Sequence, residues 1–224
     1  YLYMRAAISW SGGKDSYLAL HIAVSNGYVP TVLISMMNDL TDHSRSNGVN
    51  LEILKLQSKS LNIPIIFIKT SWQDYEKNIL KVLQTTKETY SYECCIFGDI
   101  DILEHRKFEE NVCNMAGVTA YLPLWGKSRI DLINYNVNLP ISSKIIVINN
   151  KYLSLNILGS DYNKLDFKIL ESNGIDVCGE LGEFHTVVIN APMFDFSIKL
   201  SEGITHRLES VTIIDYMSKN SKLY

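Results

Sequence analysis

The first 100 residues contain four short apolar runs separated by segments of helical periodicity. The runs cover residues 6–9, 31–34, 65–68 and 94–97. Continuous apolar runs of this length are typical of strands that are buried on both faces. The segments between them repeat apolar residues at steps of three and four, which favours helices with one buried face. The alternation predicts an α/β fold built on a doubly wound parallel sheet.

Two of the helical segments have well-defined apolar stripes. The second stripe lies within residues 108–116 and ends before Gly117, which is a plausible helix stop because glycine readily adopts the left-handed conformation of a C-terminal cap. The first stripe predicts a helix whose buried face carries Trp72, Tyr75, Ile79, Val82 and Leu83.

Size and charge limit the classes of protein that the chain can form. With 224 residues, 46% of them hydrophobic, it is long enough for one or two domains. A folded chain of this size buries roughly 70% of the surface of its unfolded form, so neither metal nor disulfides are needed for stability. The net charge of −3 provides no broad basic field, and nucleic acid is therefore not an expected partner.

The cysteines give no sign of a metal centre or of a secreted protein. Cys94 and Cys95 lie in an apolar run and no CxxC pair is present, so we expect them to fill the core. No stretch approaches the ~20 apolar residues of a membrane span, and no signal-peptide pattern marks the start of the chain. We take Met4 as the native first residue and expect a cytoplasmic protein without membrane contact.

The strongest functional signal is the sequence SGGKDS at residues 11–16, between the first apolar run and a helix that ends near Gly27. Its two glycines let the backbone approach a phosphate group closely, and the start of the helix offers unpaired N–H groups. Lys14 adds a positive charge, but Asp15 would repel a phosphate unless Mg²⁺ lay between them. The segment therefore predicts a phosphate-binding loop with Mg²⁺. It is neither a Walker A loop nor a GxGxxG fingerprint.

In this position, SGGKDS resembles the PP-loop of the N-type ATP pyrophosphatases, which have the adenine nucleotide alpha hydrolase fold. The resemblance implies that the loop holds the β and γ phosphates of ATP while an acceptor attacks the α phosphorus. The residues that it implies for binding ATP and Mg²⁺ are Ser9, Ser11, Gly12, Gly13, Lys14, Asp15, Ser16, Met36, Gly98 and Asp99, with Asp15 and Asp99 as the metal ligands.

Two further motifs narrow the family. The first combines FGDID at residues 97–101 with His105, Arg106 and PLWG at residues 123–126, and the second is DVCGELGEFHT at residues 176–186. Their order and spacing resemble the diphthine-ammonia ligase family and its bacterial relatives, from about residue 5 to residue 192. Many bacterial relatives have histidine where this chain has Asn47. This difference bears on the identity of the acceptor more than on ATP binding.

Asp99 and Asp101 follow the fourth apolar run, where a parallel sheet places its ligand-binding edge. They could hold Mg²⁺ or orient an amine, or they could cap the next helix. His105 and Arg106 could belong to the site or pair with acidic neighbours on a solvated helix face. The resemblance implies that Gly98 approaches a ribose.

Titratable groups also cluster in the last motif. Glu180, Glu183 and His185 lie within six residues, beside two glycines, and could serve acid–base chemistry or amine recognition. The alternative is a polar turn with solvated carboxylates. The predicted catalytic residues are Lys14, Asp99, Glu180, Glu183 and His185.

Together these features predict an ATP-binding domain at residues 4–122 and a smaller α/β lobe for the acceptor at residues 123–224. The predicted function is an ATP-dependent, AMP-forming ligase that amidates a carboxylate with free ammonia and releases pyrophosphate. In the resembling family the carboxylate is on an elongation factor. The alternatives are an RNA-modifying pyrophosphatase of the base-thiolating type and a non-catalytic module that binds adenine nucleotides. A homodimer is left open.

Overall fold

The computed structural model describes residues 3–219, which form two compact units. Unit 1 comprises the residues up to Ser11, Asp15–Ser46 and Asn62–Gly126, and unit 2 comprises Gly12–Lys14, Asn47–Leu61 and the chain from Lys127 onward. Two N-terminal segments therefore belong to the C-terminal unit. The single boundary between residues 122 and 123 stays a prediction.

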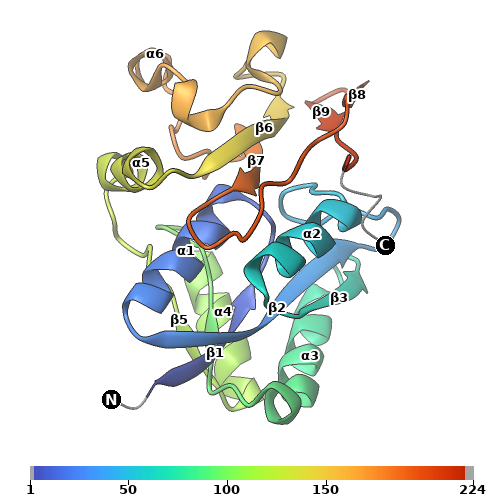
Figure 1. Ribbon diagram of the computed structural model, residues 1–224, viewed down its shortest axis with the longest axis vertical. Helices are drawn as coiled ribbons and strands as arrows, with labels where there is room; N and C mark the ends of the chain where they lie inside the picture. Colours follow the sequence, from blue (N-terminus) through green and yellow to red (C-terminus); the bar gives the residue numbers. More distant parts are fainter. Residues whose placement is uncertain (1–2, 220–224) are drawn as a thin grey trace. The chain divides into compact units, whose positions relative to one another are not determined.

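Unit 1 contains a five-stranded parallel sheet with the order β3-β2-β1-β4-β5 (Figure 1). The predicted doubly wound sheet is confirmed, and its four predicted strands are present. The fifth strand was not predicted, because its three residues, Thr119, Ala120 and Tyr121, do not form a continuous apolar run. The strands are β1 (Met4–Ser9), β2 (Tyr28–Asn38), β3 (Ile65–Thr70), β4 (Cys94–Ile96) and β5 (Thr119–Tyr121).

Helices cover both faces of this sheet. Helices α3 (Tyr75–Tyr90) and α4 (Leu103–Ala116) share a buried core with alternate strand residues such as Ala7 and Cys95. The strand residues between these, including Ile8, are equally buried. They belong to the opposite face, where Figure 1 shows α1 (Lys14–Ser25).

The ends of α3 and α4 test the predicted stripes. Gly117 follows α4 with a φ of 71°, as expected of a helix stop. Trp72, however, lies before the start of α3 and is 67% exposed, so its place in the buried stripe was wrong. Trp72 has the spacing of the apolar stripe only by chance, because α3 begins three residues later, at Tyr75.

Unit 2 contains an antiparallel sheet with the order β7-β6-β9-β8. The predicted strands at residues 144–148 and 186–189 are confirmed within β6 and β7, whereas the strands near the C-terminus were not predicted. The sheet consists of β6 (Ser142–Asn149), β7 (Phe184–Asn190), β8 (Ile204–Arg207) and β9 (Val211–Asp215), and the same unit contains α2 (Leu51–Leu61), α5 (Arg129–Asn138), α6 (Phe167–Ser172) and the short 3₁₀ helices η1 (Leu155–Ile157) and η2 (Tyr162–Lys164).

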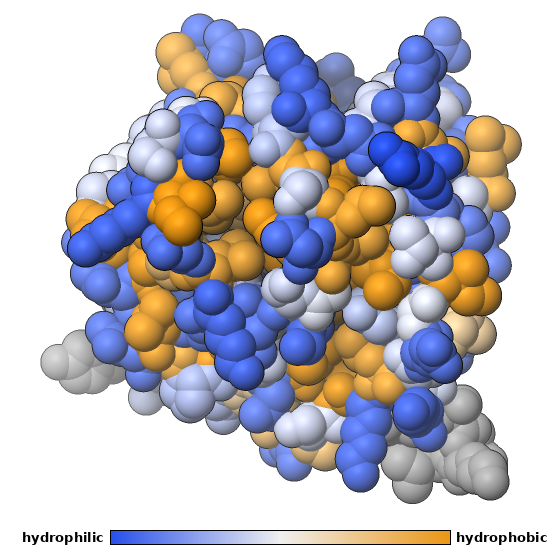
Figure 2. Space-filling view, turned by 90° about the horizontal axis from the view of Figure 1, so that it is seen from above, coloured by the Kyte–Doolittle hydropathy of each residue, from blue (hydrophilic) through white to orange (hydrophobic). Residues whose placement is uncertain are grey.

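All four cysteines are buried and free, as the core-filling interpretation predicts for Cys94 and Cys95. Among residues 3–219, no helix has the length and apolar character needed to cross a membrane. Large apolar side chains such as Ile130 and Leu181 are exposed in unit 2. On the face drawn in Figure 2, hydrophilic residues divide the hydrophobic ones into patches, as is usual for globular proteins.

Candidate functional site

The carboxyl ends of β1 and β4 meet at the position in unit 1 where the strand order reverses. In open α/β sheets, ligands bind at this edge. A Cβ atom on Gly98 would lie 3.0 Å from the carbonyl carbon of Asp15 and 3.1 Å from the amide nitrogen of Ser16. Glycine is thus required because the chain after β4 packs directly on the first turn of α1.

Hydroxyl groups surround the start of this turn. The Oγ atoms of Ser11 and Ser16 are 3.3 Å apart, and the hydroxyl of Ser44 donates to the carbonyl oxygen of Ser11 at 3.0 Å. Of the other predicted contacts to nucleotide, Ser9 ends β1, while Met36 is buried in β2 and its carbonyl accepts from the amide of Arg45.

Asp99 belongs to a cluster of three titratable side chains in unit 1. The Nδ1 atom of His105 lies 2.7 Å from the Oδ1 atom of Asp99. The buried Glu109 makes a side-chain hydrogen bond with the same carboxylate. Burial and then the hydrogen bond to Asp99 raise the pKa of Glu109 to about 11, so Glu109 is a neutral donor. Burial acts to raise the pKa of Asp99 as well, but its hydrogen bonds with His105 and Glu109 outweigh this and lower it. Asp99 is therefore an ionised carboxylate.

The other polar residues near Asp99 are placed differently. The N-cap position of α4 is Ile102, whose side chain makes no capping hydrogen bond. Asp101 is exposed. Arg106 pairs with Glu110 at 2.7 Å and lies over the ring of Trp125, on the solvated helix face that was the alternative to a site role.

The two glycines of the phosphate loop are held within unit 2. Gly12 has a φ of 83°, and its carbonyl oxygen accepts from the amide of Val188 and from Nε2 of Gln57, both at 2.9 Å. A Cβ atom on Gly13 would lie 1.9 Å from Nδ2 of Asn47, which donates to the carbonyl of Thr186 at 3.1 Å. A side chain at position 12 would be strained by the positive φ, and one at position 13 would displace the Asn47 amide from the carbonyl of Thr186.

Lys14 is only 2% exposed, although the loop pattern suggests an accessible lysine. Its ammonium group donates to the carbonyl oxygen of Cys178 at 2.5 Å and lies 5.3 and 5.7 Å from the ring centroids of Tyr162 and Phe184. Its backbone amide donates to Oγ1 of Thr186 at 3.0 Å. A carbonyl dipole and two aromatic faces thus stabilise a charge that is almost removed from water.

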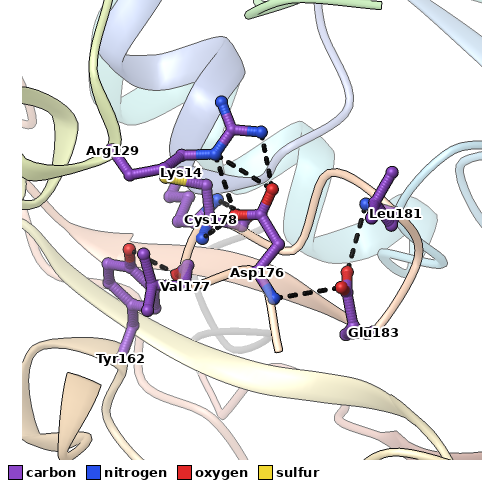
Figure 3. Close-up of polar contacts among 8 residues, drawn as sticks. All are labelled: Lys14, Arg129, Tyr162, Asp176, Val177, Cys178, Leu181 and Glu183. Carbon is purple, nitrogen blue, oxygen red and sulfur yellow. Dashed lines mark hydrogen bonds and ion pairs between the residues drawn. The ribbon is translucent and has the colours of Figure 1, made fainter. Parts of the chain in front are cut away.

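The carbonyl that receives Lys14 belongs to a turn at residues 176–183 (Figure 3). Glu183, 2% exposed, closes this turn by accepting from the backbone amides of Asp176 and Leu181, each at 3.1 Å. Both of its oxygens are thereby engaged by backbone. The structure thus gives Glu183 a turn-closing position, while Glu180 in the same turn is partly exposed.

His185 is the second residue of β7, which follows the turn, and it is partly buried. Burial and the charge of Lys14 lower the pKa of His185 to about 4. At physiological pH His185 is therefore a neutral imidazole but only a weak base, because an effective general base has a pKa near the working pH.

Several residues that shape the loop carried no usable sequence signal. Gln57 lies at helical spacing from Ile53, Leu54 and Leu61 on the buried side of α2 and is itself fully buried, but a glutamine at that position does not reveal which carbonyl groups it meets. Arg129 and Asp176 lie 47 positions apart and only the fold brings them together. Asp176 is the first residue of the late motif, and this position is the one signal that could have directed attention to it.

Unit 1 provides some of the oxygen ligands that Mg²⁺ needs, but its described residues do not form a complete site made of protein side chains. Among the described residues, no group of three His, Cys, Asp or Glu side chains could hold a metal ion. Mg²⁺ commonly binds one or two protein carboxylates together with phosphate oxygens and water. The ionised Asp99 follows Gly98, which packs on the backbone of Asp15, so unit 1 can supply the one or two carboxylates that such a site needs.

Two family models match the chain. The diphthamide synthase N-terminal domain covers residues 4–120 and the diphthamide synthase C-terminal domain covers residues 130–221. Together with these matches, a parallel sheet whose first strand leads through the SGGKDS loop into a helix defines a PP-loop-type α/β enzyme. The chain belongs to the diphthamide synthase family.

Similar proteins include diphthine–ammonia ligase of Bos taurus, 25% identical over 245 residues, which cover 96% of this chain and 90% of the relative. The diphthine–ammonia ligase of Schizosaccharomyces pombe is 25% identical over 213 residues, 86% of this chain and 35% of the relative. Among solved structures, a predicted subunit of tRNA methyltransferase from Methanocaldococcus jannaschii is 19% identical with a TM-score of 0.43, and the match covers 84% of this chain and 98% of that one.

Proposed function

We propose that the protein is an ATP-dependent, AMP-forming ligase that converts a carboxylate into an amide. The observation that carries this proposal is the glycine-rich loop 11–16, with its lysine and the start of α1. The names of the relatives, diphthine–ammonia ligases, support ammonia as the nitrogen donor. The family supports a protein-bound acceptor, of the elongation-factor type.

In the proposed reaction, a carboxylate oxygen of the acceptor attacks the α phosphorus of ATP and pyrophosphate leaves. Ammonia then attacks the acyl carbon, AMP leaves, and one proton passes to a base. Gly12 and Gly13 let the loop backbone approach the leaving pyrophosphate, and Lys14 with the N–H groups of α1 stabilises its charge. The hydroxyls of Ser11 and Ser16 add donors, and Ser9, Met36 and Gly98 complete the proposed nucleotide contacts.

Asp15 and Asp99 would hold Mg²⁺ together with phosphate oxygens, and the ion would neutralise charge on the triphosphate. The lowered pKa of Asp99 supports this role, since an ionised carboxylate is the form that binds a cation. His105 and Glu109 orient this carboxylate.

His185 is proposed to contact the attacking amine as a neutral hydrogen-bonding group, because its low pKa keeps the imidazole uncharged. Glu180 is proposed to recognise ammonia or the acceptor within the C-terminal region, residues 123–224. Glu183 contributes by closing the turn that carries Glu180. A cytoplasmic location is part of the same proposal.

The buried cysteines favour amide formation over base thiolation. Burial raises the pKa of Cys94 to about 11, and a hydrogen bond with Cys113 together with burial raises the pKa of Cys95. Thiols in this state are poor nucleophiles and poor sulfur carriers.

The test is a product analysis. The protein is incubated with ATP, Mg²⁺ and ammonium, with and without a diphthine-bearing elongation factor, and Lys14→Ala serves as the control. AMP and pyrophosphate that depend on the acceptor support the proposal. ADP and orthophosphate would contradict it, and acceptor-independent binding without turnover would favour a nucleotide-binding module.

A further inference from the structure

A continuous series of polar contacts in unit 2 connects Arg129 to Lys14 (Figure 3). Arg129, the first residue of α5, donates from Nε to both carboxylate oxygens of Asp176 at 2.9 Å and from Nη2 to Oδ2 at 2.6 Å. Oδ1 of Asp176 also accepts from the amide of Cys178 at 2.8 Å. The carbonyl of the same Cys178 receives the ammonium group of Lys14.

The turn that transmits this contact is held at two more points. Glu183 accepts from the amides of Asp176 and Leu181, and the hydroxyl of the fully buried Tyr162 donates to the carbonyl of Val177 at 2.9 Å. The ring of Tyr162 also faces the Lys14 ammonium. The orientation of the Cys178 carbonyl is thus determined by side chains on both sides of it.

Among these contacts, the ion pair between Arg129 and Asp176 is the one best suited to fix the position of the turn. The side chain of Asp176 is 10% exposed and that of Arg129 is 27% exposed, so the pair is screened by water less than a surface pair. Removing the arginine would leave a nearly buried carboxylate without its cation, which is costly enough to make the turn rearrange. A planar guanidinium also fixes the carboxylate plane, which the single ammonium of lysine does not.

We propose that Arg129 is a positioning residue for phosphate binding, which acts through Asp176 and the Cys178 carbonyl to place the side chain of Lys14. The proposal rests on the proposed function in one respect, namely that Lys14 binds the β and γ phosphates of ATP. Arg129 itself contacts no nucleotide in this account.

The test measures by calorimetry how substitutions at Arg129 and Lys14 change the affinity of the full chain for two nucleotides in the presence of Mg²⁺. The probes are α,β-methylene-ATP, which carries β and γ phosphates and resists cleavage between the α and β phosphorus atoms, and AMP, which lacks them. Arg129→Gln is expected to weaken α,β-methylene-ATP binding roughly 3- to 10-fold, the size typical of indirect coupling, and to leave AMP binding unchanged. In the Lys14→Ala background, Arg129→Gln should have no further effect on either ligand.

Two variants separate positioning from a general loss of stability. Ser128→Ala removes the N-cap of the same helix, where the hydroxyl accepts from the amide of Asp131 at 3.2 Å, and should lower the melting temperature without changing either affinity. Arg129→Lys should recover part of the lost affinity, because it restores the charge without the bidentate geometry.

The outcomes are distinct. If Arg129→Gln weakens AMP and α,β-methylene-ATP equally, or adds its full effect to Lys14→Ala, Arg129 supports the fold only and the inference is overturned. If Lys14→Ala weakens α,β-methylene-ATP binding while Arg129→Gln does not, the inference is again wrong and the proposed function stands. If Lys14→Ala itself changes neither affinity, the phosphate-binding role of Lys14 fails, and the inference fails with it.

Discussion

Gln57 and Gly12, 45 positions apart, are joined by a hydrogen bond of 2.9 Å from the side-chain amide of Gln57 to the carbonyl oxygen of Gly12. The same amide nitrogen donates to the carbonyl of Val188 in β7 at 2.8 Å. One fully buried side chain of α2 therefore ties the phosphate loop to the sheet of unit 2. The conformation of a loop that was predicted from its own six residues depends on a helix that those residues do not specify.

We expect Gln57→Leu to lower the free energy of unfolding by about 1 to 3 kcal/mol, because it leaves the carbonyl of Val188 without this donor inside the protein. ATP binding should weaken as well, since Gly12 keeps only its contact with the amide of Val188. Chemical denaturation and calorimetry measure the two effects. The matched control is Gln84→Leu at an exposed site in α3, where the side-chain bond to Met115 is 3.3 Å long. Equal effects of the two substitutions would contradict the account of Gln57.

Sequence reasoning was most successful where a feature is local. The parallel sheet and the stop at Gly117 follow from short-range patterns, and the structure confirms both. The surroundings of Lys14 could not be found in this way, because Tyr162 and Phe184 come from distant parts of the chain. Glu183 illustrates a further limit. The density of titratable residues around it in the sequence suggests a catalytic role, and only the structure reveals that two backbone amides donate to its carboxylate.

Gly98→Ala should reduce ATP binding strongly while the protein still folds. The added methyl group would meet the backbone of Asp15 and Ser16 at 3.0 to 3.1 Å, so the first turn of α1 would have to shift. Nucleotide affinity and the far-ultraviolet circular dichroism spectrum measure the two consequences. Ala116→Gly, at the end of α4, is a control for loss of helix stability in the same unit. Wild-type affinity in Gly98→Ala would show that the close approach has no bearing on the nucleotide.

Glu109→Gln should stabilise the protein at neutral and alkaline pH. The native state holds the Glu109 proton up to a pKa of about 11, whereas the unfolded chain releases it near 4.5. The native state therefore binds more protons between these values, and wild-type stability falls as pH rises. Glutamine keeps a donor for Asp99 and does not ionise, so the gain in melting temperature should grow from pH 6 to pH 9. The exposed neighbour substitution Glu110→Gln should show no such trend, and a pH-independent difference for Glu109→Gln would contradict the prediction.

His185 should make the protein sensitive to acid. Its pKa is about 4 in the native state, against 6.5 for an exposed histidine, so the unfolded chain binds the extra proton first as pH falls. Its contribution is fully present above pH 6.5 and is lost progressively toward pH 4, by up to about 3 kcal/mol. His185→Gln should flatten this part of the stability profile. His43→Gln is the control, and an unchanged acid slope in His185→Gln would show that the histidine is not held neutral.

The central claim is that a carboxylate oxygen attacks the α phosphorus, and oxygen transfer tests it most directly. An elongation factor whose diphthine carboxylate carries ¹⁸O at both oxygens is incubated with the protein, ATP, Mg²⁺ and ammonium, and the products are analysed by mass spectrometry. The account predicts one ¹⁸O atom in the phosphate group of AMP for each amide formed. Amide formation with ¹⁸O in orthophosphate and with ADP as the nucleotide product would contradict it.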